Sequence, residues 1–209
     1  QCKRMGIHMN YAPVVDVNSN AQNPVIGMRS FGENPLSVAH KGYEYMKGLQ
    51  DAGVIACAKH FPGHGDTQTD SHYTLPTVSA KKSDLRKNEL FPFQYLIDKG
   101  VAAVMTAHLS VPALDKNKRR PSSLSPKIVE KLLKKKMGFD GLIVTDGLDM
   151  KGVTKYYEEG EVALEAFAAG NDILLIPDDV KSSISSIKDA VNKKDDLRLR
   201  LAESCKKIL

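Results

Sequence analysis

The sequence predicts an α/β fold, a (β/α)8 barrel of the TIM type, from three observations. Short apolar runs alternate with longer amphipathic stretches along the chain. The apolar runs are almost continuous, which is typical of parallel strands covered by helices on both faces. Titratable side chains follow several of these runs, and reactive groups at the carboxyl ends of many parallel strands indicate a barrel.

Five strands are expected, and they span residues 7–17, 54–60, 101–108, 142–146 and 172–177. A closed barrel of this type has eight strands, so about three are missing. The chain also opens on residues typical of the tail of a helix that runs into a strand. We therefore expect an incomplete barrel whose first strands precede residue 1, within a single domain over residues 1–209.

Helices are expected between the strands and after the last one. They span residues 36–51, 82–99, 126–137, 161–169, 180–191 and 197–209. Four of them are followed by a glycine that can end a helix, namely Gly53, Gly100, Gly138 and Gly170. Ser125 is a suitable N-cap for the third.

A doubly wound open sheet is the competing architecture. No glycine-rich phosphate loop follows any expected strand, which disfavours its dinucleotide-binding version. The polar residues at the strand ends favour the barrel. These residues are Asp16, Lys59, His60, His108, Asp146, Asp178 and Asp179.

Composition narrows the functional classes. No apolar run approaches the ~20 residues that a membrane helix requires, so no membrane insertion is expected. The net charge is +5, and much of the excess lies in residues 116–120 and 134–136. Because no aromatic residues interleave with these charges, we interpret both clusters as solvated surface and expect no nucleic-acid partner. Three widely spaced cysteines form neither a metal motif nor a disulfide framework.

The densest cluster of reactive side chains is KHFPGHGDTQTDSH, residues 59–72. It carries three histidines, two aspartates and a lysine, and its Pro-Gly and Gly residues indicate a loop after a strand. Three interpretations compete: a metal site, a solvated polar loop and a site for sugar hydrolysis. The ligand types suit a metal, but the Pro-Gly between His60 and His64 excludes a helical HxxxH pair.

This string resembles the signature of the β-N-acetylglucosaminidase branch of glycoside hydrolase family 3. The resemblance covers most of the chain and keeps the order of the family's motifs. Its other segments are APVVDV at 12–17, RSFG at 29–32, VMTAH at 104–108 and VTDGLDM at 144–150.

The resemblance implies roles for individual residues. Asp146 matches the nucleophile, His72 the general acid/base, and Asp70 the partner of His72 in a dyad. The residues that match sugar-binding positions are Lys59, His60 and Arg29. The family also uses an aspartate from an earlier strand, which this sequence does not contain. No metal and no organic cofactor is implied.

The chemistry agrees with these roles. A retaining glycosidase needs an anion below the anomeric carbon and a proton donor beside the leaving oxygen. An imidazole, whose ordinary pKa is near ~6.5, can donate and take back a proton near neutral pH. Asp70 could orient the His72 ring as the acid of a catalytic triad does. Lys59 would favour the ionised form of Asp146 by charge attraction.

The expected reaction is removal of terminal, non-reducing β-linked N-acetylglucosamine with retained configuration, through a glycosyl-enzyme. The resemblance suggests peptidoglycan fragments of a bacterium as the carbohydrate substrate. Phosphorolysis and β-glucosidase activity are alternatives within the family. A non-catalytic sugar-binding protein and a metallohydrolase are alternatives of other classes.

Four further polar residues near the expected site carry a weaker signal. We expect Asp16 and His108 to have structural roles, and His64 and Asp66 to hold the loop in shape. Met150 could pack either against the acetamido group of the sugar or within the core.

Overall fold

The computed structural model describes residues 1–67, 75–158 and 160–209. Its centre is a parallel sheet of β1 (Met9–Asn10), β2 (Ile55–Phe61), β3 (Ala103–Thr106) and β4 (Leu142–Thr145), in that order. Each neighbouring pair is parallel. The predicted α/β class with a parallel sheet is confirmed, while the described residues form an open sheet and not a closed barrel.

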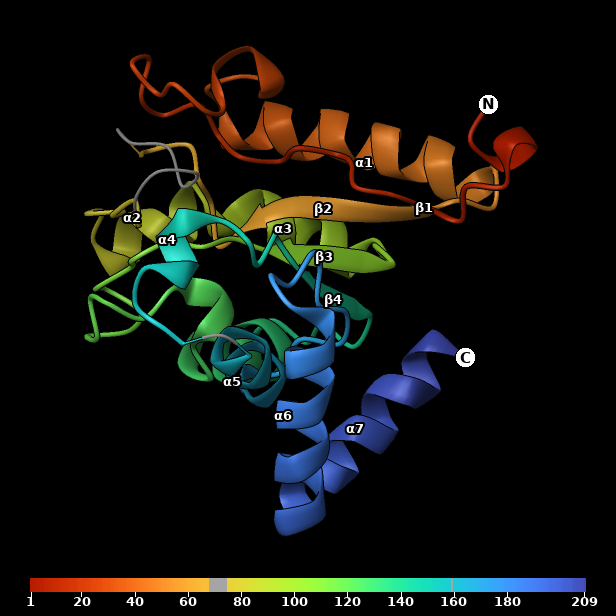
Figure 1. Cartoon of the computed structure of the whole chain (residues 1–209). Helices are drawn as coiled ribbons and strands as arrows, with labels where there is room; N and C mark the ends of the chain where they lie inside the picture. Colours follow the sequence, from red (N-terminus) through yellow and green to blue (C-terminus); the bar gives the residue numbers. More distant parts are fainter. Residues whose placement is uncertain (68–74, 159) are drawn as a thin grey trace.

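Helices connect the strands and follow the last one (Figure 1). They are α1 (Pro35–Asp51), α2 (Lys82–Lys87), α3 (Leu90–Asp98), a π-helix (Lys127–Lys136), α4 (Lys151–Thr154), α5 (Glu161–Ala169), α6 (Val180–Lys193) and α7 (Asp195–Ile208). Short 3-10 turns occur at Lys3–Met5, Gly27–Arg29 and Ser122–Leu124. Within the described ranges, no helix is both long and apolar enough to cross a membrane.

Both faces of the sheet are apolar, which explains the continuous hydrophobic runs. Successive strand residues point to opposite faces, so Ala56 and Ala58 enter one core cluster while Cys57 enters another. The larger cluster includes side chains of α1 and α3, such as Met46 and Phe93. The smaller cluster is bordered by partly buried side chains and lies on the face that would point into a barrel.

The helix predicted over residues 82–99 is two helices, α2 and α3, so that prediction was wrong in its middle. Pro92 lies four residues after Asn88. Its ring has no N–H to donate to the Asn88 carbonyl and would clash with that carbonyl in a continuous helix. Asn88 accordingly leaves the ideal helical conformation, with φ −105° and ψ −76°.

The outer strands are shorter than predicted. In the first, the segment after Asn10 passes through a cis Ala12–Pro13 bond before Val14 pairs with Lys59. At the other edge, the predicted strand 172–177 keeps only one bridge, between Ile173 and Val144. There the Leu175 N–H donates to the Thr145 hydroxyl at 2.9 Å instead of to a backbone carbonyl, so the ladder ends.

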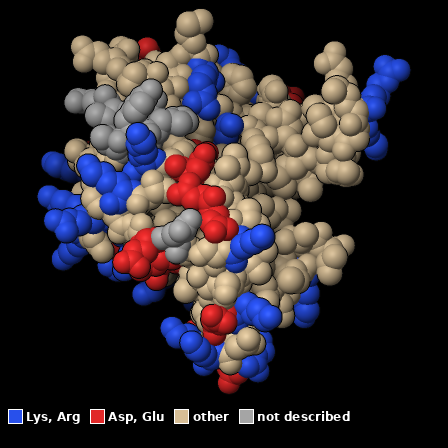
Figure 2. Space-filling model, in the orientation of Figure 1, with Lys and Arg blue, Asp and Glu red and all other residues tan. Residues whose placement is uncertain are grey.

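The first basic cluster lies on the surface, as interpreted from the sequence, and in the second Lys135 and Lys136 are exposed, whereas the Lys134 side chain is only 16% exposed. Lys116, Lys118 and Arg119 are exposed. Their loop is anchored by the buried Asp115, which accepts hydrogen bonds from Ser125 and Lys127. Figure 2 shows Lys and Arg side chains along the periphery of one face, with Asp and Glu gathered nearer its middle.

Candidate active site

The candidate site lies at the carboxyl-terminal edge of the sheet. Because the strands are parallel, residues that end each strand meet at this edge. Lys59 and His60 lie near the end of β2, and Asp146 follows β4 directly. Asp16 joins them from the segment that pairs with Lys59. The sequence prediction that strand ends collect the reactive groups is therefore confirmed for Lys59, His60 and Asp146, whereas Asp16 lies beyond the end of β1.

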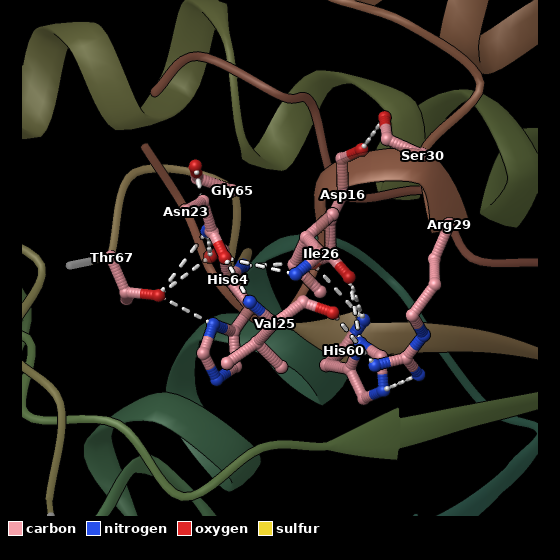
Figure 3. Close-up of polar contacts among 10 residues, drawn as sticks. All are labelled: Asp16, Asn23, Val25, Ile26, Arg29, Ser30, His60, His64, Gly65 and Thr67. Carbon is pink, nitrogen blue, oxygen red and sulfur yellow. Dashed lines mark hydrogen bonds and ion pairs between the residues drawn. The ribbon is translucent and has the colours of Figure 1, made fainter. Parts of the chain in front are cut away.

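Asp16 is fully buried and organises the backbone around it. One carboxylate oxygen lies 2.7 Å from His60 Nδ1, and the other accepts from the His64 backbone N–H at 2.7 Å (Figure 3). Burial acts to raise the pKa of this carboxyl, but the contacts with His60 and His64 outweigh it and hold the pKa below its ordinary value. Its 0% exposure agrees with the structural role expected for it.

His60 links this buried carboxylate to Arg29. The Arg29 guanidinium lies 3.3 Å from His60 Nε2, and Figure 3 shows the two side chains meeting end to end. A guanidinium can only donate, so Nε2 is the acceptor and Nδ1 carries the hydrogen that reaches Asp16. The ring is thus held from both sides, with the exposed Arg29 as its outer partner.

Lys59 places a half-buried ammonium among the same groups. Burial lowers its pKa most, and the neighbouring Arg29 charge lowers it further. Asp146, Cys57 and Asp16 act in the opposite direction. Within residues 1–67, 75–158 and 160–209, the Lys59 ammonium makes no hydrogen bond or ion pair. It is therefore available to a ligand or to Asp146.

Asp146 opens into a cavity of about 380 Å³. The carboxylate is half-buried, and its Oδ1 accepts the Gly147 N–H at 2.9 Å. Met150, Leu175 and Ile176 give the cavity an apolar wall, so Met150, whose place the sequence left open, faces this cavity. Ile176 is exposed and has a positive φ of 45°, a conformation that is rare for a β-branched residue and is often found at functional sites.

The loop after β2 is fastened to the segment before Arg29 by Asn23. Its amide donates to the carbonyls of His64 and Gly65 at 2.8 and 3.0 Å, and its oxygen accepts from two backbone N–H groups of its own turn. His64 is buried, with Nδ1 2.7 Å from the Thr67 hydroxyl. Figure 3 shows this network beside Asp16, so one polar cluster shapes both segments.

His72 and Asp70, the predicted acid/base and its partner, lie outside the described residues. Their meeting with Asp146 stays a prediction. Among the described residues, no group of three or more His, Cys, Asp or Glu side chains is arranged to hold a metal ion.

Comparison with known proteins decides the family. The whole chain, residues 1–209, matches the glycosyl hydrolase family 3 N-terminal domain. The chain belongs to glycosyl hydrolase family 3.

Relatives in glycosyl hydrolase family 3 agree with the branch that the motifs indicated. Beta-hexosaminidase A of Pseudoalteromonas piscicida is 43% identical over 183 residues, covering 83% of this chain and 31% of that protein. The beta-hexosaminidase of Nitrosomonas eutropha is 35% identical over 202 residues, covering 95% and 57%. This chain thus spans only about a third to just over a half of the length of these relatives.

A solved structure gives the same result for the fold. A family 3 β-N-acetylglucosaminidase from Paenibacillus sp. str. FPU-7 superimposes with a TM-score of 0.94 and 42% identity. The match covers 99% of this chain and 40% of that one. The parallel sheet and its helices are therefore those of the family 3 N-terminal domain.

The family 3 motifs identified the charged residues of the site but not the uncharged residue that holds its loops in place. Hydrogen bonds connect His60 to Arg29 and to Asp16, while Lys59 interacts with Asp146 through charge alone across the same sheet edge. Sequence analysis missed Asn23, because an asparagine in a polar loop carries no signal that distinguishes a buried one.

Proposed function

We propose that this protein is a retaining exo-β-N-acetylglucosaminidase of family 3. The observation that carries the proposal is the placement of Asp146. Its carboxylate faces a cavity at the sheet edge where Lys59 and the His60–Arg29 pair also end. An anion and cationic, hydrogen-bonding groups at one edge of the sheet suit a sugar whose anomeric carbon meets the anion and whose hydroxyls meet the other groups.

The proposed reaction has two steps. Asp146 attacks the anomeric carbon while His72, oriented by Asp70, protonates the leaving oxygen, which gives a glycosyl-enzyme. His72 then removes a proton from water, and the water releases the sugar with retained configuration. Gly147 occupies Oδ1 of Asp146, which leaves Oδ2 for the attack. The charges of the Lys59 ammonium and the Asp146 carboxylate attract one another across the same sheet edge.

The proposal extends to the architecture and the substrate. The four-stranded sheet is part of a (β/α)8 barrel, and residues 1–209 belong to its single catalytic domain. The open edges of the described sheet and its partly covered inner face support this proposal. The relatives named beta-hexosaminidase support an N-acetylglucosamine-containing glycan as substrate, and peptidoglycan fragments are the proposed source.

Covalent trapping tests the nucleophile. The full-length protein is incubated with a 5-fluoro-N-acetylglucosaminyl fluoride, digested and mapped by mass spectrometry. We expect one label, on Asp146. Asp146→Asn should lower kcat by about 10³-fold or more. Asp140→Asn removes an exposed carboxylate beyond the opposite end of β4 and should leave labelling unchanged.

Three results would contradict parts of the proposal. A label on another residue, such as Asp149, removes the nucleophile assignment. Faster turnover with phosphate, together with a sugar 1-phosphate product, indicates phosphorolysis instead of hydrolysis. Preference for an aryl glucoside over the matching aryl N-acetylglucosaminide indicates a β-glucosidase.

A further inference from the structure

His108 is a fully buried imidazole beside the candidate nucleophile. It follows β3 by two residues and is 1% exposed, so it cannot touch a substrate. Burial lowers the pKa of the ring, which favours its neutral form. A leucine could fill the same buried position without placing polar atoms away from water. The imidazole at this position therefore suggests a role for its two ring nitrogens.

Both ring nitrogens have partners. Nε2 lies 2.8 Å from the Gly147 carbonyl oxygen, and Nδ1 lies 2.7 Å from the Ser123 hydroxyl. A carbonyl only accepts, so Nε2 carries the hydrogen, and in the neutral ring Nδ1 accepts from Ser123. The tautomer is therefore fixed by the two contacts.

Gly147 joins this imidazole to the nucleophile. Its carbonyl accepts from His108, and its own N–H donates to Asp146 Oδ1 at 2.9 Å. The turn is also tight, because a Cβ at Gly147 would lie 2.7 Å from Asp149 Oδ1. The direction of the Gly147 N–H thus depends on where His108 holds the next peptide group.

The support behind His108 is itself fixed. The Ser123 carbonyl accepts from the Asn171 amide at 2.8 Å, and the oxygen of that amide accepts from the Thr106 hydroxyl at 2.8 Å. All of these side chains are buried. A continuous polar chain therefore runs from the end of β3 through Asn171 and Ser123 to His108.

We propose that His108 is a positioning residue for the nucleophile. It holds Gly147 so that the Gly147 N–H occupies Asp146 Oδ1, which directs Oδ2 to the anomeric carbon. This inference rests on the proposed function, because it needs Asp146 to be the attacking group.

Two amide substitutions separate the two contacts of the ring. His108→Gln keeps a donor near the position of Nε2 and can still bond to Gly147. His108→Asn places its amide near the position of Nδ1 and keeps only Ser123. Relative to the Gln variant, we expect the Asn variant to form the trapped glycosyl-enzyme about tenfold more slowly or worse. KM and the midpoint of thermal unfolding should be similar in the two variants.

The split between kcat and KM gives a readout that a purely structural role would not move. If His108 acts only by directing the Asp146 carboxylate, His108→Asn should lower kcat relative to His108→Gln while KM stays the same in the two variants. Equal trapping rates and equal kcat values in the two variants would overturn the inference.

The experiment distinguishes this inference from the proposed function. If Asp146 is not labelled in the wild-type protein, the proposed function fails. If Asp146 is labelled and the two His108 variants behave alike, only the positioning role fails. Should His108→Asn not fold, Ser123→Ala replaces it, because loss of the Ser123 hydroxyl frees the ring to turn away from Gly147. A wild-type trapping rate in that variant would also overturn the role.

Discussion

At the scale of single residues, two buried carboxylates near the site have opposite environments. Asp16 accepts hydrogen bonds on both oxygens and keeps a lowered pKa. Glu89 is 2% exposed, and besides a backbone hydrogen bond its carboxyl has a long side-chain contact from Ser19 at 3.5 Å, while Oε2 has no partner among the described residues. Burial raises the pKa of Glu89 to about 7, and the charge of Asp66 adds to the effect.

Glu89 should therefore make stability fall as pH rises. In the unfolded chain the carboxyl ionises near its ordinary pKa of 4.5, whereas the folded protein keeps the proton up to about pH 7. Between these values the folded state binds more protons, so the free energy of unfolding decreases with pH and levels off above 7. Glu89→Gln should remove most of this loss, roughly 2–3 kcal/mol for a shift from 4.5 to about 7.

Urea unfolding at pH 5 and pH 8 measures this effect. Glu89→Gln should be more stable than the wild type at pH 8 and close to it at pH 5. Glu44→Gln, which removes an exposed carboxylate of α1, serves as the control and should give the same small difference at both pH values. If Glu89→Gln also shows a pH-independent difference, the carboxyl titrates normally in the folded protein.

At the scale of elements, α1 approaches the sheet through a glycine. Gly42 is buried in the middle of α1, and a Cβ there would lie 2.7 Å from Val15 Cγ1. Val15 is 0% exposed and β-branched, so its side chain cannot easily turn away. Gly48 lies in the same helix, and a Cβ there would meet nothing within 4 Å.

Alanine at these two glycines should have opposite effects. Gly48→Ala should stabilise the protein by about 0.5–1 kcal/mol, because alanine has the higher helix propensity. Gly42→Ala gains the same propensity but overpacks the contact with Val15, and should destabilise by about 1–3 kcal/mol. Thermal unfolding of both variants checks the pair. A stabilised Gly42→Ala would mean that α1 shifts away from Val15 at little cost.

Strands and helices were predictable where the local sequence pattern alone determines them. Residues 54–60 and 142–146 were predicted as strands because they are continuous apolar runs, and both are confirmed within a residue or two. The break between α2 and α3 could have been found from Pro92 alone. The helix at Lys127–Lys136 was predicted, but its π form was not, because its bonds, such as Lys131 N–H to Pro126 carbonyl, depend on packing and not on composition.

The charged residues of the site were predictable from the sequence, but the buried polar residues around them were not. Parallel strands bring Lys59, His60 and Asp146 to one edge, so their proximity followed from the fold class. Asn23 bonds to carbonyls more than 40 residues away, and Glu89 lies in a polar stretch where a glutamate is normally exposed. Such long-range contacts leave no periodic signal in one sequence.

At the scale of the whole molecule, the C-terminal helix is fastened to the sheet by one buried carboxylate. α7 lies beside β4 (Figure 1). The Asp172 side chain is 0% exposed and accepts from Arg200 at 3.0 Å, Ser204 at 2.8 Å and Lys207 at 3.2 Å, all on α7. It also accepts the Ile143 N–H of β4 at 3.0 Å. This residue thus links a strand and a helix that are far apart in sequence.

Asp172→Asn should loosen α7 from the sheet. Burial acts to raise the pKa of Asp172, but its hydrogen bonds and the two cations outweigh burial and lower it. A lowered pKa contributes stability that is present above pH 4 and lost as pH falls through the folded value. The variant leaves Arg200 and Lys207 without their counter-ion, so unfolding free energy near pH 7 should drop by about 2–4 kcal/mol.

Hydrogen exchange tests whether this loss is local to α7. In Asp172→Asn, amides of α7 should exchange faster than those of β2 and β3, and the acid-induced loss of stability below pH 4 should shrink. Asp51→Asn removes an exposed carboxylate that pairs with Lys47 on α1, and should leave both exchange and stability near wild type. Uniformly faster exchange in every element of Asp172→Asn would instead mean that α7 and the sheet unfold as one unit, since the anchor would then stabilise the whole molecule equally.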